Sequence, residues 1–205
     1  MTVELLYFAN PMCSWCWGFA PVVKQLAERH RVTLALGALG RGDGPMRPQD
    51  KAFVREHWEH VHARTGQPFD FSFFDREGFV YDTEPACRAV AVVREQRPGS
   101  TLPYLETVQE AFYARNRDVT RADELRRLAE AVGLDGEGFA RALLGSKASA
   151  GLAHEFAETA RIGVTGYPTL LGLAGGRAQI LSLGCRSLAE VEAALTALLG
   201  DAGGA

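Results

Sequence analysis

The sequence of 205 residues predicts an α/β protein, in which a strand–helix–strand segment and a strand–strand–helix segment flank a long block of helices. Three observations support this fold class. Apolar runs of strand length and one amphipathic stretch alternate over the first 36 residues. The stretch 49–162 shows helical periodicity without a strand-like run. Strand-like sequence returns only after residue 163.

The first segment is a predicted βαβ unit. Leu5–Ala9 is an apolar run typical of a strand, and Asn10-Pro11 ends it. A helix is expected from about Trp17 to Arg29, and Val32–Leu36 is expected to be the second strand. The crossover between these two strands should be right-handed. The apolar stripe of the helix consists of Phe19, Val22, Val23, Leu26 and Ala27.

The middle of the chain is predicted to be helical. Gly37–Pro48, with four glycines and two prolines, is interpreted as a flexible linker into this part. Residues 67–81 contain five phenylalanines without a helical period, so we expect an aromatic loop that packs across other elements. Thr120 and Asp135 are the expected caps of two helices. The expected helices are 49–64, 84–96, 102–115, 121–132, 136–144 and 146–161.

The last segment is a predicted hairpin followed by a helix. Thr169–Leu173 and Ala178–Leu183 have strand character, and Gly175-Gly176 between them is a turn signal. Ser187-Leu188-Ala189-Glu190 matches a capping box and should open a helix that ends near Leu199.

The two ends together have the element order of a thioredoxin-like fold, βαβ followed by ββα. The predicted domains are therefore a thioredoxin-like domain built from residues 1–48 and 163–205, and an all-helical insertion domain over residues 49–162.

Composition and charge argue against several classes of function. Apolar residues make up 47% of the chain and charged residues 23%, as in ordinary folded domains. The net charge of −3 gives no reason to expect nucleic acid or an anionic membrane as a partner. No apolar run is long enough to span a membrane. Met1-Thr2-Val3-Glu4 lacks the features of a leader, so we expect a cytoplasmic protein. The expected oligomeric state is a monomer or a homodimer.

A pair of cysteines stands where the first strand meets the first helix, in Cys13-Ser14-Trp15-Cys16. The first N–H groups of a helix lack partners and the helix dipole is positive there, and both favour a thiolate at Cys13. Cys16 lies one turn further on the same face, close enough to attack a mixed disulfide at Cys13. The pattern indicates a dithiol/disulfide redox pair. Its expected supporting residues are Pro11, Met12 and Ser14.

A zinc site is the alternative interpretation of the pair. It needs two further ligands, and no second CxxC or CxxH motif supplies them, so Cys87 and Cys185 would have to do so. These two cysteines are interpreted as buried and inert, with a role as extra thiols left open. His57 and His60 share a helix face that His62 does not, so we predict a solvated helix and no metal site.

Two stretches carry a resemblance to a known family. Met12–Phe19 and Gly163–Leu170 resemble the two signatures of the DsbA-like family, and within it the chain is most similar to the FrnE-like cytoplasmic branch of disulfide oxidoreductases and isomerases. Shorter matches at His57-Trp58, Thr65–Phe69 and Glu84–Ala89 extend the resemblance over nearly the whole chain.

The resemblance implies a role for each site residue. Cys13 would be the attacking thiol and Cys16 the resolving one. Pro168 would be a cis-proline beside the pair, and Tyr167 before it would offer backbone groups to an incoming peptide. Trp15 is interpreted as an apolar lip that contacts the substrate, whereas Trp17 is expected in the core. Gly166 completes the expected substrate-binding set.

The expected activity is thiol–disulfide exchange with protein or small-molecule thiols and disulfides. No cofactor or metal is implied, and electrons would come from glutathione or another dithiol system. The sequence leaves open whether the protein oxidises, reduces or isomerises. The alternatives are a glutathione-dependent transferase or isomerase and a non-enzymatic redox sensor. In the related kappa-class transferases and 2-hydroxychromene-2-carboxylate isomerases a serine stands where this chain has Cys13.

Overall fold

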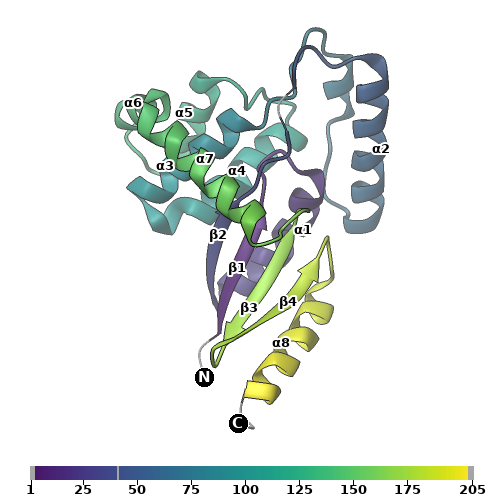
Figure 1. The fold of residues 1–205 in the computed structure, drawn as a ribbon. Helices are drawn as coiled ribbons and strands as arrows, with labels where there is room; N and C mark the ends of the chain where they lie inside the picture. The colour runs from purple at the N-terminus through teal and green to yellow at the C-terminus, as the bar shows by residue number, and fades with distance from the viewer. Residues whose placement is uncertain (1–2, 41, 203–205) are drawn as a thin grey trace.

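Four strands form one mixed sheet in the order β2-β1-β3-β4 (Figure 1). The computed structural model describes residues 3–40 and 42–202, so the predicted domain ranges extend outside it at residues 1–2, 41 and 203–205. β1 is parallel to β2 and antiparallel to β3, and β3 is antiparallel to β4. The strands are β1 (Glu4–Ala9), β2 (Arg31–Leu36), β3 (Thr169–Ala174) and β4 (Arg177–Leu183).

The two ends of the chain therefore meet inside the sheet, at the pair of β1 and β3. This confirms the predicted thioredoxin-like fold with a helical insertion, and the predicted hairpin, because β3 and β4 pair through the turn at Gly175-Gly176. Leu5, Tyr7 and Ala9 of β1 are buried, so the central strand carries the core.

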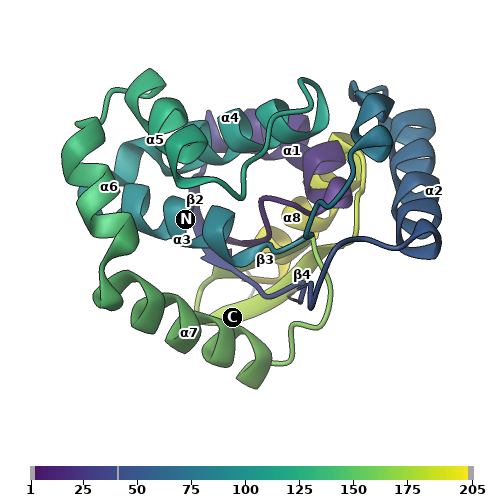
Figure 2. The same cartoon turned by 90° about the horizontal axis from the view of Figure 1, so that it is seen from above.

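Helices cover both faces of the sheet (Figure 2). The turn after α1 (Ser14–Ala27) is joined to α8 (Leu188–Ala202) by an ion pair of 2.6 Å between Arg29 Nη2 and Glu192. α7 (Ser146–Arg161) lies on the opposite side of the sheet from α1. Gly172 of β3 permits the close approach of α8, since a Cβ there would lie 2.7 Å from Leu198.

The insertion consists of the helices α2 to α7 and two short 3₁₀ turns. The bounds agree with the expected ranges within two residues. They are α2 (Pro48–Thr65), η1 (Phe71–Asp75), α3 (Glu84–Gln96), η2 (Pro98–Ser100), α4 (Thr101–Tyr113), α5 (Ala122–Ala131), α6 (Gly136–Leu144) and α7. None of the helices in the described part of the chain combines the length and apolar character that a membrane crossing needs.

Trp58 of α2 is the centre of an aromatic cluster that fixes the 67–81 loop. It is fully buried, and its ring lies 4.9 Å from the rings of both Phe73 and Phe74. On the other side it meets Tyr113 of α4 at 5.0 Å. The predicted packing of the aromatic loop is confirmed, with one 3₁₀ turn inside it that the sequence did not predict.

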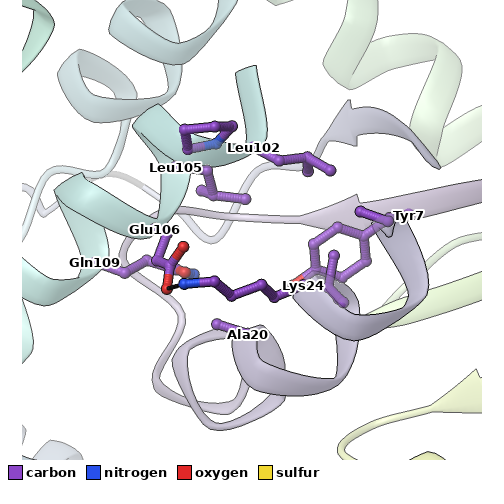
Figure 3. A pocket seen from close by; sticks show the side chains of 10 residues that line it. Tyr7, Ala20, Lys24, Leu102, Leu105, Glu106 and Gln109 are labelled. Carbon is purple, nitrogen blue, oxygen red and sulfur yellow. Dashed lines mark hydrogen bonds and ion pairs between the residues drawn. The ribbon is translucent and has the colours of Figure 1, made fainter. Parts of the chain in front are cut away.

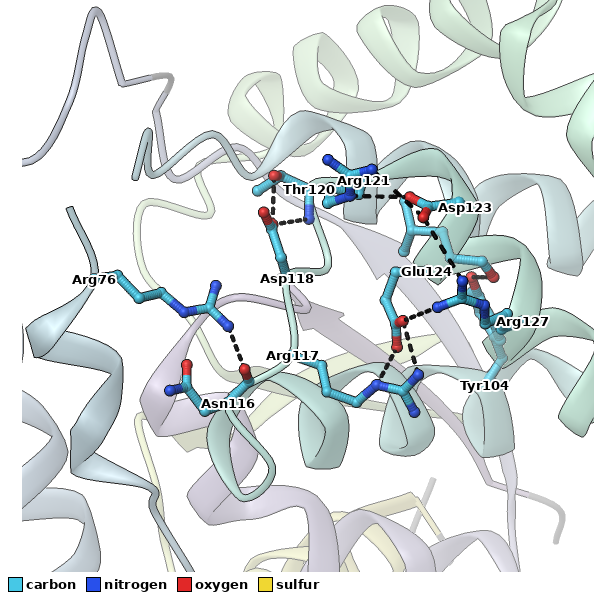
Figure 4. Close-up of polar contacts among 11 residues, drawn as sticks. Arg76, Tyr104, Asn116, Arg117, Asp118, Thr120, Arg121, Asp123, Glu124 and Arg127 are labelled. Carbon is cyan, nitrogen blue, oxygen red and sulfur yellow. Dashed lines mark hydrogen bonds and ion pairs between the residues drawn. The ribbon is translucent and has the colours of Figure 1, made fainter. Parts of the chain in front are cut away.

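One predicted helix start and one predicted helix cap are wrong. α1 begins at Ser14, three residues before the expected Trp17, because the side chain of Cys13 caps it. Thr120 does not cap α5, whose N-cap is Arg121. The backbone N–H and hydroxyl of Thr120 both donate to Asp118, at 3.0 and 2.6 Å (Figure 4). A local turn around Asp118 therefore uses the group that was expected to cap the helix.

The buried carboxylate of Glu124 ties α5 to the end of α4. Arg117 pairs with it at 2.6 Å and Arg127 at 3.4 Å (Figure 4). Its side chain is only 8% exposed, so both arginines are needed to compensate its burial. This network is structural and lies among the helices of the insertion.

The edge strand β2 is covered by polar side chains from the insertion. Glu155 of α7 accepts a hydrogen bond from the Leu36 backbone N–H at 2.8 Å, and Thr159 donates to the Leu36 carbonyl at 2.9 Å. Arg94 of α3 donates to the Leu34 carbonyl and pairs with Glu155 at 2.6 Å. These contacts satisfy the outward-facing edge that a second chain could otherwise extend.

Glu155→Ala is expected to lower the free energy of unfolding by about 1–3 kcal/mol, because it leaves the buried Leu36 N–H and the Arg94 guanidinium unpaired. Urea denaturation measures the loss. Glu158→Ala is the matched control, since Glu158 lies on the same helix in an exposed pair with Arg161 and its removal should change little. An equal loss in both variants contradicts a role for Glu155 at the edge.

Candidate active site

Cys13 is the N-cap residue of α1. Its backbone is extended, with φ −95° and ψ 115°, and its sulfur accepts a hydrogen bond from the backbone N–H of Cys16 at 3.4 Å. Its carbonyl accepts from the Trp17 N–H at 3.1 Å, which starts the helix. A sulfur at this position lies where unpaired N–H groups and the helix dipole favour negative charge.

The two thiols differ in pKa because they differ in depth and partners. The hydrogen bond from the Cys16 side chain is the largest cause of a lowered pKa at Cys13, and the backbone N–H groups of Cys16 and Trp15 add to it. Burial raises the pKa of Cys16 well above its ordinary value. Cys13 is 7% exposed and Cys16 is fully buried, so of the two only Cys13 reaches the surface.

Asn10 holds the loop that carries Cys13. Its side-chain oxygen accepts from the Met12 N–H at 2.9 Å, and its amide nitrogen donates to the Gly37 carbonyl at 2.8 Å. The same nitrogen lies 3.2 Å from both Thr83 Oγ1 and Cys87 Sγ. The sequence marked Asn10 only as a strand breaker. Its role here follows from contacts with residues up to 77 positions away, which no local pattern reveals.

Tyr167 and Pro168 stand beside Cys13, as the resemblance implies. The peptide bond between them is cis. The thiol of Cys13 lies 3.5 Å from the Tyr167 carbonyl, which it approaches as a donor. Thr169 donates to the Gly166 carbonyl at 2.8 Å and so fixes the turn that precedes β3.

Gly37 makes room for the Tyr167 ring. A Cβ at position 37 would lie 1.9 Å from that ring. The sequence assigned Gly37 to a flexible linker, whereas the structure gives it a specific packing role. Gly42 is similar, since a Cβ there would lie 3.2 Å from the Tyr81 backbone N.

Tyr81 is a site residue that the sequence did not predict. Its hydroxyl donates to the Met12 carbonyl at 2.8 Å, directly before Cys13. It comes from the end of the aromatic loop, where one more aromatic residue carries no special signal. The insertion therefore supplies a group that positions the reactive loop.

An open cleft of about 770 Å³ leads to Cys13. Trp15 of α1 and Tyr167 before β3 line it, together with Phe53 and His57 of α2. Phe53 is 63% exposed, so this rim offers an apolar surface to a substrate. Glycines of the 37–48 segment form part of the wall.

The two tryptophans of the motif differ in environment as the sequence suggested. Trp15 is half-buried and lines the cleft. Trp17 is 5% exposed, stacks on Tyr113 with ring centroids 6.4 Å apart, and donates to the Pro68 carbonyl at 3.0 Å.

The remaining cysteines lie apart from the cleft wall. Cys87 is fully buried behind Asn10, and burial raises its pKa well above the usual range. Cys185 is half-buried, its carbonyl accepts from Arg64 at 3.0 Å, and burial raises its pKa as well. Both thiols are therefore protonated and poor nucleophiles at neutral pH.

Two histidines of α2 bond to backbone carbonyls. His57 Nδ1 lies 2.9 Å from the Phe53 carbonyl oxygen, and His62 Nδ1 lies 2.8 Å from that of Gln67. Across residues 3–40 and 42–202, no three His, Cys, Asp or Glu side chains are grouped as metal ligands would be.

Comparison with known proteins identifies relatives over nearly the whole chain. Residues 4–196 match the family described as the DSBA-like thioredoxin domain. A crystal structure from Nitrosomonas europaea, of a protein proposed to be a disulfide isomerase, is 33% identical with a TM-score of 0.90, covering 98% of this chain and 99% of that one.

Two further relatives differ in what their names report. The cytosolic disulfide reductase DsbM from Pseudomonas aeruginosa is 28% identical with a TM-score of 0.79, covering 96% of this chain and 98% of that one. It has also been solved with glutathione. The ClpXP adapter protein SpxH from Bacillus subtilis is 26% identical over 171 residues. The match covers 82% of this chain but only 57% of that adapter's length.

Cys16→Ala is expected to raise the pKa of Cys13, because it removes the side-chain hydrogen bond that is the largest cause of the lowered value. The thiolate absorbance of Cys13, followed in the ultraviolet as a function of pH, measures the change. Cys185→Ala removes a thiol with no such contact and should leave the titration of Cys13 in place. An unchanged titration midpoint of Cys13 in Cys16→Ala contradicts the role of this hydrogen bond.

Gly37→Ala is expected to lower the free energy of unfolding by about 1–3 kcal/mol, because the new methyl group must displace the Tyr167 ring. The alkylation rate of Cys13 should change with it, since the Tyr167 carbonyl borders that sulfur. Gly44→Ala is the control, because a Cβ at Gly44 meets no atom within 4 Å. Equal stability of the two variants contradicts the packing role.

Proposed function

The chain belongs to the family of DSBA-like thioredoxin domains, and from this premise we propose that it is a thiol–disulfide oxidoreductase whose chemistry is carried by Cys13 and Cys16. The observation that supports this most is the unequal pair at the start of α1. One sulfur has a lowered pKa and borders a cleft, and the other is buried within reach of it.

The first step is attack by the Cys13 thiolate on one sulfur of a substrate disulfide. A bond forms between that sulfur and Cys13, and the other substrate sulfur leaves as a thiolate that takes a proton from solvent. Cys16 then loses its proton and attacks Cys13, which closes the Cys13–Cys16 disulfide and releases the second substrate thiol. The substrate is reduced by two electrons and the pair is oxidised. The reverse sequence oxidises a dithiol substrate.

The substrate binds along the cleft beside Cys13. Trp15 offers an apolar surface, and the backbone of Gly166-Tyr167 ahead of Pro168 offers hydrogen bonds to an extended chain. Pro11, Met12 and Ser14 shape the loop around the sulfur. Support comes from the position of the Tyr167 carbonyl, 3.5 Å from the Cys13 sulfur.

We place this activity in the cytoplasm, acting on protein or small-molecule disulfides. The name of the DsbM relative supports both the compartment and the class of reaction. Electrons would come from glutathione or another dithiol system, and the glutathione complex of that relative supports the former. No metal or organic cofactor enters the proposed steps.

The reduction potential of the pair decides the direction of the reaction. It can be measured by equilibrating the protein in glutathione buffers and quantifying the Cys13–Cys16 disulfide. A value near about −270 mV, as in thioredoxin, indicates a reductant, and one near about −120 mV, as in DsbA, indicates an oxidant.

Two other functions remain as rival candidates. A glutathione-dependent transferase or isomerase needs no second thiol, so it predicts full turnover by Cys16→Ser and no dithiol exchange by the wild type. The second rival is a binding module without turnover, and some relatives of the chain are named as adapter proteins. This rival predicts a partner whose affinity changes on oxidation of the pair. Negligible exchange by the wild type would favour that second rival.

Cys13→Ser is expected to abolish reduction of insulin, because it removes the attacking sulfur. Cys16→Ser should retain the first attack and accumulate a mixed disulfide at Cys13, visible by mass spectrometry, because nothing resolves it. Cys185→Ser is the matched control and should behave as the wild type, since its thiol is not part of the pair. Insulin reduction by Cys13→Ser at the wild-type rate would falsify the proposed function.

A further inference from the structure

The resolving cysteine has no direct path to solvent. Cys16 is fully buried, and it does not line the cleft in which Cys13 lies. While a substrate is bonded to Cys13, the cleft side is also occupied. Since only a thiolate attacks a disulfide, the Cys16 proton must leave by another side before resolution.

Tyr7 of β1 lies behind Cys16. Its side chain is 1% exposed, and its ring packs on Phe19 of α1 with centroids 6.1 Å apart. Its hydroxyl makes no hydrogen bond of standard geometry within the described residues. The Tyr7 side chain interacts with that of Cys16, and this interaction lowers the pKa of Cys16 against the larger effect of burial.

A small cavity adjoins Tyr7 between α1 and α4 (Figure 3). On the α1 side it is lined by Ala20 and Lys24, which follow Cys16 at intervals of four residues and so share its helix face. The cavity therefore continues the stripe that begins at Cys16. Its volume of about 160 Å³ has room for several water molecules, since one needs on the order of 10–15 Å³.

The cavity has polar groups for such water. Gln109 of α4 is 1% exposed, and its amide nitrogen lacks a partner within the described part of the chain. Lys24 and Glu106 pair across the cavity at 2.9 Å, with side chains 62% and 41% exposed (Figure 3). A path thus runs from Tyr7, past Gln109, to a charged pair that reaches solvent.

We propose that Tyr7 links Cys16 to this cavity in the resolving step: its hydroxyl passes the proton that Cys16 releases to water in the cavity between α1 and α4, and then donates a hydrogen bond to the Cys16 thiolate. This inference rests on the proposed thiol–disulfide exchange. The phenol stays neutral before and after this transfer, because burial raises the pKa of Tyr7 well above its usual range.

The step balances without another reactant. The Cys16 S–H bond breaks and its proton passes to the Tyr7 oxygen, while the Tyr7 hydroxyl proton passes to water in the cavity that Tyr7 lines. The thiolate, stabilised by Tyr7, forms the bond to the Cys13 sulfur, and the Cys13–substrate bond breaks. The substrate thiolate leaves with the electron pair and takes a proton from solvent on the cleft side.

Other titratable groups near Cys16 do not replace Tyr7. Cys13 raises the pKa of Cys16, through a hydrogen bond and through its charge. The phenols of Tyr113 on α4 and Tyr167 before β3 also sense the charge of Cys16, and both have raised pKa values through burial. Tyr7 is the side chain whose interaction with Cys16 lowers the pKa of that thiol.

The test follows attack by Cys13 and resolution by Cys16 as two phases of one absorbance trace. A chromogenic aromatic disulfide releases one coloured thiolate when Cys13 attacks and a second when Cys16 resolves. In Tyr7→Phe the second phase is expected to slow roughly ten- to a hundredfold at neutral pH, the effect of one hydrogen bond to a charged group. The pH midpoint of that phase should rise, while the first phase keeps its rate.

Tyr104→Phe is the matched control. It removes the hydroxyl of another buried tyrosine, one that donates to the Leu125 carbonyl among the helices of the insertion. Both phases should keep their wild-type rates and midpoints. A purely structural effect of losing a buried hydroxyl would appear in thermal stability for both variants and would not move the pH midpoint of one phase.

A second variant tests the cavity and leaves the Tyr7 hydroxyl in place. Ala20→Leu fills the space beside Tyr7 and is expected to slow the second phase only, whereas Gln25→Leu, on the exposed face of α1, should not. An unchanged pH midpoint in Tyr7→Phe, or an unchanged second phase in Ala20→Leu, overturns the inference. Absence of the first phase in the wild type would instead refute the proposed function itself.

Discussion

The amide of Asn10 is the contact on which the site and the fold depend together. It ends β1, and its four polar contacts reach the reactive loop, the linker after β2, and two positions at the start of α3. Asn10 is fully buried, so each partner it lost would leave a polar group without water, at about 1–3 kcal/mol. The sheet, the loop with Cys13 and the helical insertion are therefore held at one point.

The two sulfurs differ in burial, and the roles that we propose for them differ accordingly. Placing Cys13 at the cap of α1 gives it backbone donors and contact with the cleft. One turn of helix carries Cys16 inward, against β1, where burial opposes its ionisation. The same geometry that lowers the pKa of Cys13 raises the pKa of Cys16. In the mechanism that we propose, the groups behind Cys16, Tyr7 above all, determine how readily the second step follows the first.

Local patterns predicted most of the fold and pointed to the cysteine pair of the candidate site. The strands, six helices of the insertion and the Ser187–Glu190 capping box depend on spacing within a few residues, and the structure has them. Thr120 was wrongly predicted to cap α5, because its hydroxyl donates to Asp118 instead. Asn10, Gly37 and Tyr81 could not be found, because their roles come from contacts between segments far apart in the chain. The sequence shows an asparagine, a glycine and a tyrosine, and only the packing shows what each one touches.

The helical insertion is part of the reactive centre as well as a wall beside it. One buried apolar cluster extends from β1 and α1 through Trp17 and Trp58 into α4, without a boundary between sheet and insertion. Through Tyr81 the insertion holds the carbonyl before Cys13, and through Tyr113 it supports Trp17. The Cys13 sulfur stays near the first backbone N–H groups of α1 only while the loop before it is fixed. We therefore expect the insertion to influence the pKa of Cys13 even where it does not line the cleft. We also expect a change in the packing of α4 to reach the loop with Cys13, because Tyr113 of α4 stacks on Trp17 and Phe112 of α4 packs on Tyr81.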